Sequence, residues 1–258
     1  MRELTAEALS ILEQTHTEGC GLFQGTAHRH ESFKIAREVE QHRWNWKPKE
    51  TKLVLVAESH VFTTIEEWEL KIIASKIRPF LRRNSILPPS HFVRLVYCLA
   101  YGESELLDLR GVRMSNSGTP AYWDILGRIS FRCPQPRGED GAKFSDRMKW
   151  KIETLRELYR MGVWLLDASV HAIYLRNRRR LPNEIQQELH NQWWKGYGRF
   201  LMTHCGFPKI WVIGKTVHKC LANTEGWSCN GWIYQPNAPV FDLNRNWPEV
   251  LEDCWALR

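Results

Sequence analysis

Three short apolar runs in this sequence stop abruptly at small or ionisable residues. They span residues 52–57, 162–166 and 209–213, and they end at Glu58, at Asp167 and at Gly214-Lys215-Thr216. Apolar runs of this length are typical of buried strands in parallel sheets. Ligands of open α/β sheets bind at the carboxyl ends of the strands. The pattern therefore predicts that these polar ends meet at one site, although each run alone also fits an ordinary buried strand.

Helical patterns alternate with the strand-like runs, which favours a parallel sheet covered on both faces. We expect an α/β protein: a three-layer α/β/α fold with a central, mostly parallel four-stranded sheet. The 258 residues, 43% of them hydrophobic, fit one domain, with an N-terminal helical arm over about 1–50. Further strand patterns lie at 91–97 and 232–234, and helical patterns at 2–14, 65–78, 120–127, 145–160, 184–205 and 215–222. Residues 16–50 are expected to be irregular, and 132–142 to form a mobile loop.

The formal net charge of +7 indicates a polyanionic partner. Basic residues gather at Arg176, Arg178, Arg179 and Arg180, and again at Lys76, Arg78, Arg82 and Arg83. Thirteen tryptophans add flat faces that suit unstacked bases, although many must be core and a basic cluster is often only a solvated face. These features together favour a nucleic acid as the partner.

Other features of the composition exclude several classes of protein. The apolar runs are too short to span a membrane, and no basic leader precedes an apolar segment at the start, so we expect a cytoplasmic monomer. The seven cysteines include no C-x-x-C pair, so neither a zinc ribbon nor a redox dithiol is indicated. No upstream glycine at P-loop spacing precedes Gly214-Lys215-Thr216, which disfavours an ATPase. No metal or cofactor is expected.

Five segments follow one another in a recognisable order: Ala-Glu-Ser-His at 57–60, Gly-Thr-Pro-Ala-Tyr-Trp at 118–123, Leu-Leu-Asp-Ala at 165–168, Trp-Val-Ile-Gly-Lys at 211–215 and Gln-Pro-Asn-Ala-Pro at 235–239. Together they resemble motifs of the uracil-DNA glycosylase superfamily. Two positions depart from its pattern, since Asp167 stands where Asn is usual and Gln235 where His is usual. The lack of paired cysteines argues against the iron–sulfur branch of that superfamily.

The resemblance implies a DNA glycosylase that flips a nucleotide out of the helix, hydrolyses its N-glycosidic bond and leaves an intact abasic site. Glu58 would stabilise the oxocarbenium-like transition state and orient water, while Gln235 would donate a neutral hydrogen bond to the base. The expected base pocket comprises Asp167, His60, Phe62, Tyr97 and Asn237. The expected DNA contacts are Gly214, Lys215, Thr216, Arg176, Arg178 and Arg179. His171 is a further candidate donor, and Val240-Phe241 a candidate wedge; ordinary structural roles remain open for all of these.

Asp167 bears on the identity of the base. An ionised carboxylate only accepts hydrogen bonds, so it suits the amino group of cytosine and not the O4 atom of uracil. Because unmodified cytosine cannot be a tolerated target, the hypothesis is a modified cytosine, such as the glucosylated hydroxymethylcytosine of some phages, removed by an anti-phage glycosylase. Three alternatives stay open: repair of uracil or deaminated bases with a protonated Asp167, a non-catalytic DNA-binding module, and a nucleoside hydrolase.

Overall fold

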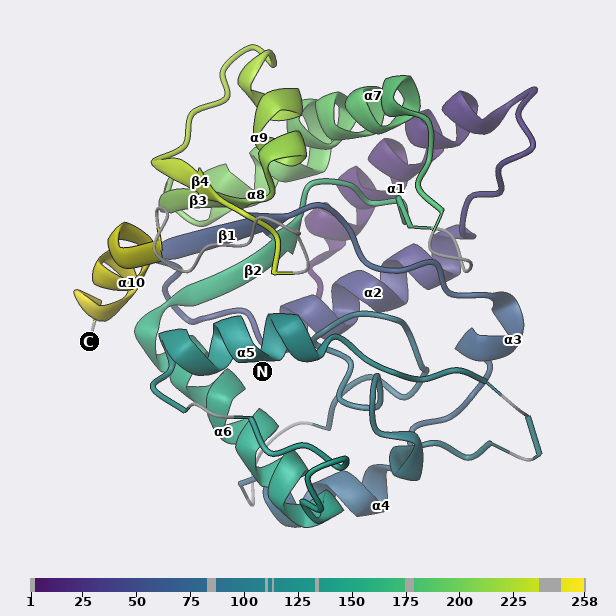
Figure 1. Cartoon of the computed structure of the whole chain (residues 1–258). Coiled ribbons are helices and arrows are strands. Elements are labelled where there is room, and N and C mark those ends of the chain that lie inside the picture. The colour runs from purple at the N-terminus through teal and green to yellow at the C-terminus, as the bar shows by residue number, and fades with distance from the viewer. Residues whose placement is uncertain are drawn as a thin grey trace.

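A four-stranded sheet forms the centre of the protein. The computed structural model describes residues 3–82, 87–109, 111–112, 114–132, 135–174, 179–236 and 247–257. The strands are β1 (Leu53–Ala57), β2 (Val163–Asp167), β3 (Lys209–Ile213) and β4 (Gly231–Ile233). Their order is β2-β1-β3-β4, and every pairing is parallel (Figure 1). The predicted three-layer α/β/α architecture is confirmed, with a sheet that is wholly parallel among the described strands.

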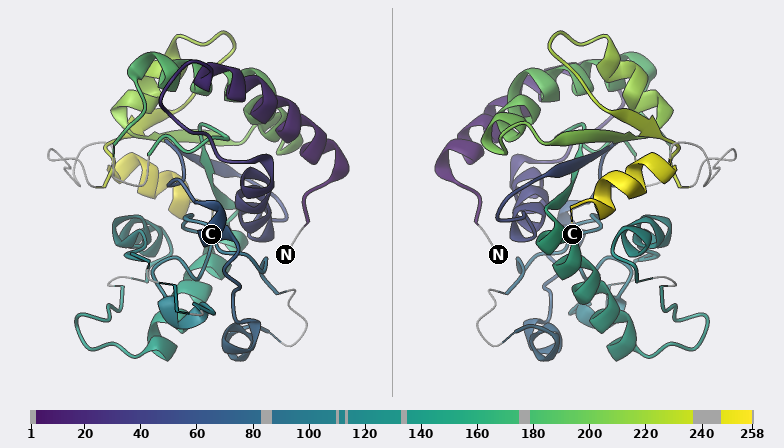
Figure 2. Two further views of the ribbon diagram at one scale, coloured as in Figure 1. Left: turned by 90° about the vertical axis from the view of Figure 1, so that its right-hand side faces the viewer. Right: turned by 90° about the vertical axis from the view of Figure 1, so that its left-hand side faces the viewer.

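Helices cover both faces of this sheet. One face carries α1 (Ala6–Cys20), α7 (Asn183–Trp193), α8 (Arg199–His204) and α9 (Lys215–Ala222), and the other carries α5 (Pro120–Ile129) and α6 (Phe144–Met161), as Figures 1 and 2 show. The remaining helices are α2 (Phe33–Asn45), α3 (Ile65–Trp68), α4 (Ala74–Ile77), α10 (Trp247–Trp255) and 3-10 turns at Gly21–Phe23, Arg78–Phe80 and Ser104–Leu106. Among the described residues, none of the helices combines the length and apolar character needed to cross a membrane.

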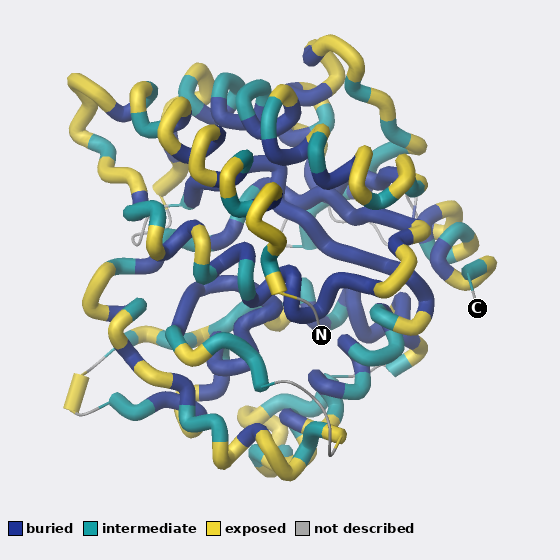
Figure 3. Tube along the Cα trace, turned by 180° about the vertical axis from the view of Figure 1, so that it is seen from behind, coloured by how far each residue is buried: buried dark blue, intermediate teal, exposed yellow. Residues whose placement is uncertain are grey.

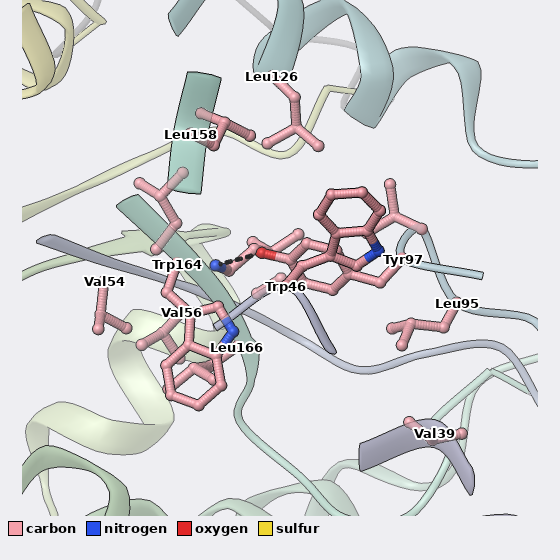
Figure 4. Packing of buried hydrophobic residues seen from close by; sticks show 14 of the residues in the cluster. Val39, Trp46, Val54, Val56, Leu95, Tyr97, Leu126, Leu158, Trp164 and Leu166 are labelled. Atoms are coloured by element: carbon pink, nitrogen blue, oxygen red, sulfur yellow. Dashed lines mark hydrogen bonds between the residues drawn. The ribbon is translucent and has the colours of Figure 1, made fainter. Parts of the chain in front are cut away.

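Burial on both faces explains why the strands are continuous apolar runs. Every residue of β1 and β2 is buried. The centre of the molecule is dark blue in Figure 3, whereas many residues of the outer helices are exposed. The ring of Tyr97 packs inside this core near Trp46 and Leu126 (Figure 4). Its hydroxyl accepts the backbone N–H of Leu165 at 2.9 Å.

Local chemistry fixes the ends of several elements. The Thr5 side chain caps α1 by accepting the Ala8 N–H at 3.1 Å. At the other end of the domain, α6 stops at Gly162, whose φ of 83° is left-handed and favours glycine. A Cβ at Gly162 would also lie 2.8 Å from the carbonyl oxygen of Glu50, so the chain can turn directly from α6 into β2 only with glycine there.

The helix predicted at 184–205 is a nearly continuous rod with one irregular turn. A π-helical turn over Trp194–Gly198 separates α7 from α8. Within it, the Tyr197 N–H donates to Thr15 Oγ1 at 3.1 Å. A Cβ at Gly196 would lie 2.4 Å from the same oxygen. Glycine at this position therefore allows α1 to approach the π-helical turn closely.

Three predictions of secondary structure are wrong. No strand forms at 91–97; this segment is a buried irregular connection, and its apolar residues reflect burial in the core. Residues 16–50 are not mainly irregular, because α1 continues to Cys20 and α2 follows. The helix predicted at 65–78 is divided into α3 and α4 by a stretch in which Lys71 and Ile72 form isolated bridges.

Candidate active site

The order of the strands reverses at the carboxyl ends of β1 and β3. The chain leaves β1 towards β2 and leaves β3 towards β4, so the two connections diverge on either side of this point. Such a reversal of strand order is where open α/β sheets bind ligands. Glu58 follows β1, Gly214 follows β3, and Gln235 comes two residues after the end of β4. The sheet therefore brings these three predicted site residues to one edge.

Glu58 is the buried centre of this edge. Only 1% of the residue is exposed. Its Oε2 atom accepts a hydrogen bond from Gln235 Nε2 at 3.1 Å, and its Oε1 atom is ion-paired with Arg180. The Tyr174 hydroxyl donates to Gln235 Oε1 at 3.4 Å. We call Glu58, Gln235, Arg180 and Tyr174 the carboxylate cluster.

Two paired connections position the carboxylate cluster. The segment after β1 runs beside the segment after β2, with a parallel bridge between Val61 and Tyr174 and a 3.0 Å hydrogen bond from the Phe62 N–H to the Tyr174 carbonyl. Tyr174 also forms an antiparallel bridge with Arg180, whose guanidinium lies 5.2 Å from the Tyr174 ring centre. The Arg180 side chain is 38% exposed, so it joins the buried Glu58 to solvent.

Gly214 packs closely against Gln235. Its φ of 117° lies in the region that favours glycine. Its N–H donates to the Ile233 carbonyl at 2.7 Å, and a Cβ at this position would lie 3.1 Å from Gln235 Cγ. The next two residues, Lys215 and Thr216, are exposed at the first turn of α9. Their backbone N–H groups belong to the helix end that favours anions.

Asp167 belongs to a second, separate network. Its Oδ2 atom accepts from Arg43 at 2.6 Å and from His60 Nδ1 at 3.2 Å. The other ring nitrogen of His60 contacts Glu31 Oε2 at 2.6 Å, and Arg43 also pairs with Glu40. We call these five buried residues the ion network. It adjoins the carboxylate cluster because Asp167 pairs in register with Ala57, the residue before Glu58.

Electrostatics keep both Asp167 and His60 charged at neutral pH. Burial opposes the charge of His60, but Glu31 and Asp167 outweigh it and raise its pKa to about 9. Burial likewise opposes the charge of Asp167, but Arg43 and then His60 outweigh it and lower the pKa of Asp167. A carboxylate offers about four lone-pair sites. The Arg43 and His60 side chains both contact Oδ2, and the His60 backbone also donates to this carboxylate.

The phenol of Tyr122 interacts electrostatically with one residue of each group. Burial is the main reason that the pKa of its phenol is raised, and Asp167 and Tyr174 add to the effect. Tyr122 therefore lies near both the ion network and the carboxylate cluster. It belongs to the 118–123 segment, which the sequence had singled out without assigning this tyrosine a role.

The other predicted site residues fall in different places. Phe62 lies beside Tyr174 and is partly buried, whereas Tyr97 is a core residue with 2% exposure, which leaves it no free face for a base. His171 contacts the His16 carbonyl under α1, away from the carboxylate cluster. Arg179 is exposed. Arg83, Arg176, Arg178, Asn237 and Val240-Phe241 lie outside the described residues.

Sequence reasoning missed Arg43, Glu31 and Tyr174. Arg43 contacts a residue 124 positions away in the chain, and Glu31 contacts one 29 positions away. Neither has a local spacing that would reveal its partner. Tyr174 lies two residues before the basic cluster at 176–180. This closeness to a predicted DNA-contact region was the one feature of the sequence that could have indicated a role for Tyr174.

A cavity of about 660 Å³ lies elsewhere in the protein. Its lining includes Trp46, which precedes β1, and Tyr159, which precedes β2, so the cavity is at the amino ends of the strands. Glu58 follows the carboxyl end of β1. This cavity is therefore separate from the carboxylate cluster.

Comparisons with family models, curated proteins and solved structures found no match to this chain. The likeness to the uracil-DNA glycosylase superfamily thus depends on the motifs quoted above.

Proposed function

We propose that the protein is a monofunctional DNA glycosylase that removes a modified cytosine from an extruded nucleotide. The observation that carries this proposal is the contact of Glu58 with Gln235 at 3.1 Å, at the carboxyl edge of the sheet where β1 ends. A buried carboxylate beside a neutral amide donor provides the two groups that hydrolysis of an N-glycosidic bond needs. One supports positive charge on the sugar, and the other supports the departing base.

In the proposed reaction the C1′–N bond breaks and its electron pair leaves with the base. The sugar becomes oxocarbenium-like, and Glu58 stabilises this cation electrostatically. Water then forms the new C1′–O bond and loses a proton to Glu58. The Gln235 amide donates to the O2 atom of the base, a weaker contact than a cationic donor would give. The base anion takes up a proton from solvent and Glu58 returns its proton to solvent, so the products are an abasic site and the neutral free base.

Arg180 gives the proposed site a way to respond to DNA. In the free protein it neutralises Glu58, whose buried charge would otherwise destabilise the fold. Because its side chain is 38% exposed, it can reach a phosphate when DNA binds. Transfer of Arg180 from the carboxylate to a phosphate would leave Glu58 free to face the sugar. DNA binding and activation of the carboxylate would then be a single event.

Asp167 supports a cytosine-type base over uracil. Arg43 and His60 hold it in the ionised form, which accepts but cannot donate hydrogen bonds. Uracil would present its O4 acceptor to this carboxylate, whereas cytosine would present an amino donor. A site whose buried groups match one base rejects the mismatched base by several powers of ten. The uracil-repair alternative requires a proton on Asp167, which these partners oppose.

The expected substrate is a foreign base such as glucosylated hydroxymethylcytosine, since a host genome must be spared. The net charge of +7 and the exposed Lys215 and Thr216 support a DNA partner. The proposal also takes the protein to act as a cytoplasmic monomer.

A substrate panel tests the proposal. Duplexes carrying uracil, cytosine, hydroxymethylcytosine or glucosylated hydroxymethylcytosine are incubated with the protein, and abasic sites are then cleaved with alkali. We expect cleavage only with a modified cytosine. Glu58→Gln should abolish it while DNA binding persists, and Glu225→Gln, at an exposed position, should behave as wild type.

Two outcomes would overturn the proposal. Excision of uracil alone would favour the repair alternative. DNA binding without excision of any base would favour a non-catalytic module.

A further inference from the structure

A cluster of metal-binding side chains lies where α1 leads into the loop before α2. It consists of His16, Cys20 and His30, and one ligand atom from each lies within 4.8 Å of the other two. The distance from Cys20 Sγ to His16 Nδ1 is 3.6 Å, and that to His30 Nδ1 is 3.5 Å. His16 is buried, Cys20 half-buried and His30 exposed, so the cluster extends from the core to solvent.

These two separations fit a tetrahedral zinc site. With Zn–S near 2.3 Å and Zn–N near 2.0–2.1 Å, the sulfur–nitrogen edge of a tetrahedron is about 3.5–3.6 Å. A thiol–imidazole hydrogen bond has a similar length. His30 Nδ1 also contacts the Glu31 carbonyl at 2.9 Å, so the exposed His30 ring would have to turn to offer a free nitrogen to the metal.

The surroundings of His16 are those of a metal ligand. Its Nε2 atom contacts the Glu31 carbonyl at 3.0 Å, which leaves Nδ1 as the nitrogen that faces Cys20. Metal-bound histidines characteristically donate the other ring N–H to a carbonyl or carboxylate, which fixes the ring.

A buried, unsatisfied polar atom lies beside the cluster. The His171 ring stacks on His16 with 4.5 Å between ring centres, and His171 is 1% exposed. Its Nε2 atom contacts the His16 carbonyl, but its Nδ1 atom has no hydrogen-bond partner among the described residues. Such atoms are rare in native proteins and often indicate an ion or water. Three protein ligands leave a fourth zinc position for water, which would supply a nearby polar group.

We propose that His16, Cys20 and His30 bind one Zn²⁺ ion. Binding converts the Cys20 thiol to a thiolate, forms the Zn–S bond and releases one proton to solvent. The ion would tie the end of α1 to the loop that carries Glu31. Because Glu31 also contacts His60, the metal would hold one end of the ion network in place. The proposal does not depend on the glycosylase activity.

Cobalt substitution tests the site directly. The purified full-length protein is stripped with a chelator, titrated with Co²⁺ and monitored for thiolate-to-cobalt charge transfer, and zinc content is measured on the protein as purified. We expect one metal ion per chain and a charge-transfer band that Zn²⁺ displaces. Cys20→Ser should abolish the band, and His30→Ala, at an exposed position, should weaken metal binding by at least about 10-fold.

Matched variants provide the controls. Cys205→Ser changes another half-buried cysteine, and His28→Ala changes a histidine of the same loop outside the cluster. Both should bind metal as wild type does. Protein that folds without a bound metal ion and shows no charge-transfer band would overturn the proposal, as would a Cys20→Ser variant that retains the band.

Discussion

Gln235 Nε2 donates a hydrogen bond to Glu58 Oε2 at 3.1 Å, although 177 residues separate the two positions in the chain. The contact joins the end of the first strand to the segment after the last. A hydrogen bond to a charged group contributes about 1.5–3 kcal/mol. In this protein the bond also orients the amide that we propose faces the departing base.

Replacing Gln235 by Ala should slow base excision without weakening DNA binding. Loss of one preorganised donor to developing charge lowers kcat by about 10²–10³-fold in well-characterised enzymes, and a neutral amide should fall at the lower end. Single-turnover excision and DNA affinity measured on the same preparation provide the check. Gln14→Ala, on the exposed part of α1, is the control. An unchanged rate would remove Gln235 from the mechanism.

Gly214→Ala should impair the site more than an equally strained glycine elsewhere. The added Cβ would meet Gln235 Cγ at 3.1 Å, in a backbone with φ of 117°. Gly226→Ala is a matched control, since Gly226 has a φ of 74° and open space around its Cβ position. Both variants should lose about 1–3 kcal/mol of stability. Only Gly214→Ala should also reduce excision; equal activity of the two would contradict the packing argument.

Arg180→Ala should reduce the salt dependence of DNA binding. If Arg180 contacts one phosphate in the complex, the slope of log K against log salt should fall in magnitude by about 0.9. Arg160→Ala removes the same charge from the exposed end of α6, where Arg160 pairs with Glu157. That variant should leave the slope unchanged. Fluorescence anisotropy over a range of salt concentrations measures the slope for each variant. If Arg180→Ala and the wild-type protein have identical slopes, the phosphate contact is excluded.

Asp167→Asn should destabilise the fold. The amide cannot balance the buried charges of Arg43 and His60, and breaking a buried ion pair from one side typically reduces the free energy of unfolding by about 3–5 kcal/mol. Urea denaturation measures the loss, with the exposed Asp140→Asn as a control. Removing the Arg43 charge as well should recover part of the stability. A variant as stable as wild type would show that the ion network contributes little.

Stability should fall on both sides of neutral pH. The pKa of His60 is about 9 in the folded protein against an ordinary 6.5, so its contribution of up to about 3 kcal/mol is complete below pH 6.5 and is lost as the pH rises through 9. His42 and His190 act in the opposite direction. Burial lowers the pKa of each to about 4, so their neutral forms favour folding above pH 6.5, and this contribution is lost as the pH falls through 4.

Guanidinium denaturation between about pH 5 and about pH 9 tests this dependence. A His60→Asn variant should lose much of the alkaline decline while the acid decline persists. If the alkaline decline is the same in both proteins, His60 is not its cause.

The sequence predicted the sheet well because apolar strands between helices leave a strong local pattern. The segment 209–213 and the helix 215–222 match β3 and α9 in both bounds. The failure at α2 has a physical cause: its buried face carries Glu40, His42 and Arg43 as well as apolar residues. These polar residues satisfy one another or distant partners in the core, so the helix has no clean apolar stripe to recognise.

The candidate site was also predicted only in part. Residues at strand ends, such as Glu58 and Gln235, were predicted together because parallel topology brings strand ends together. The partners of Asp167 come from α2 and from the loop after β1, and no rule of spacing connects Arg43 with a strand that begins at Val163. Tyr97 was misread because a tyrosine with its hydroxyl on a backbone N–H has the same sequence signature as one that lines a pocket.

One of the two inner strands of the sheet, β1, is also the first of the described strands to be synthesised. Leu53 pairs with Val163 on one side and with Lys209 on the other, positions that leave the ribosome much later. Until then β1 has two unsatisfied edges and a strongly apolar sequence, and long-range pairings of this kind slow folding. We therefore expect the nascent chain to bind chaperones until β3 has emerged. Truncations that end before residue 209 should aggregate when they are expressed alone.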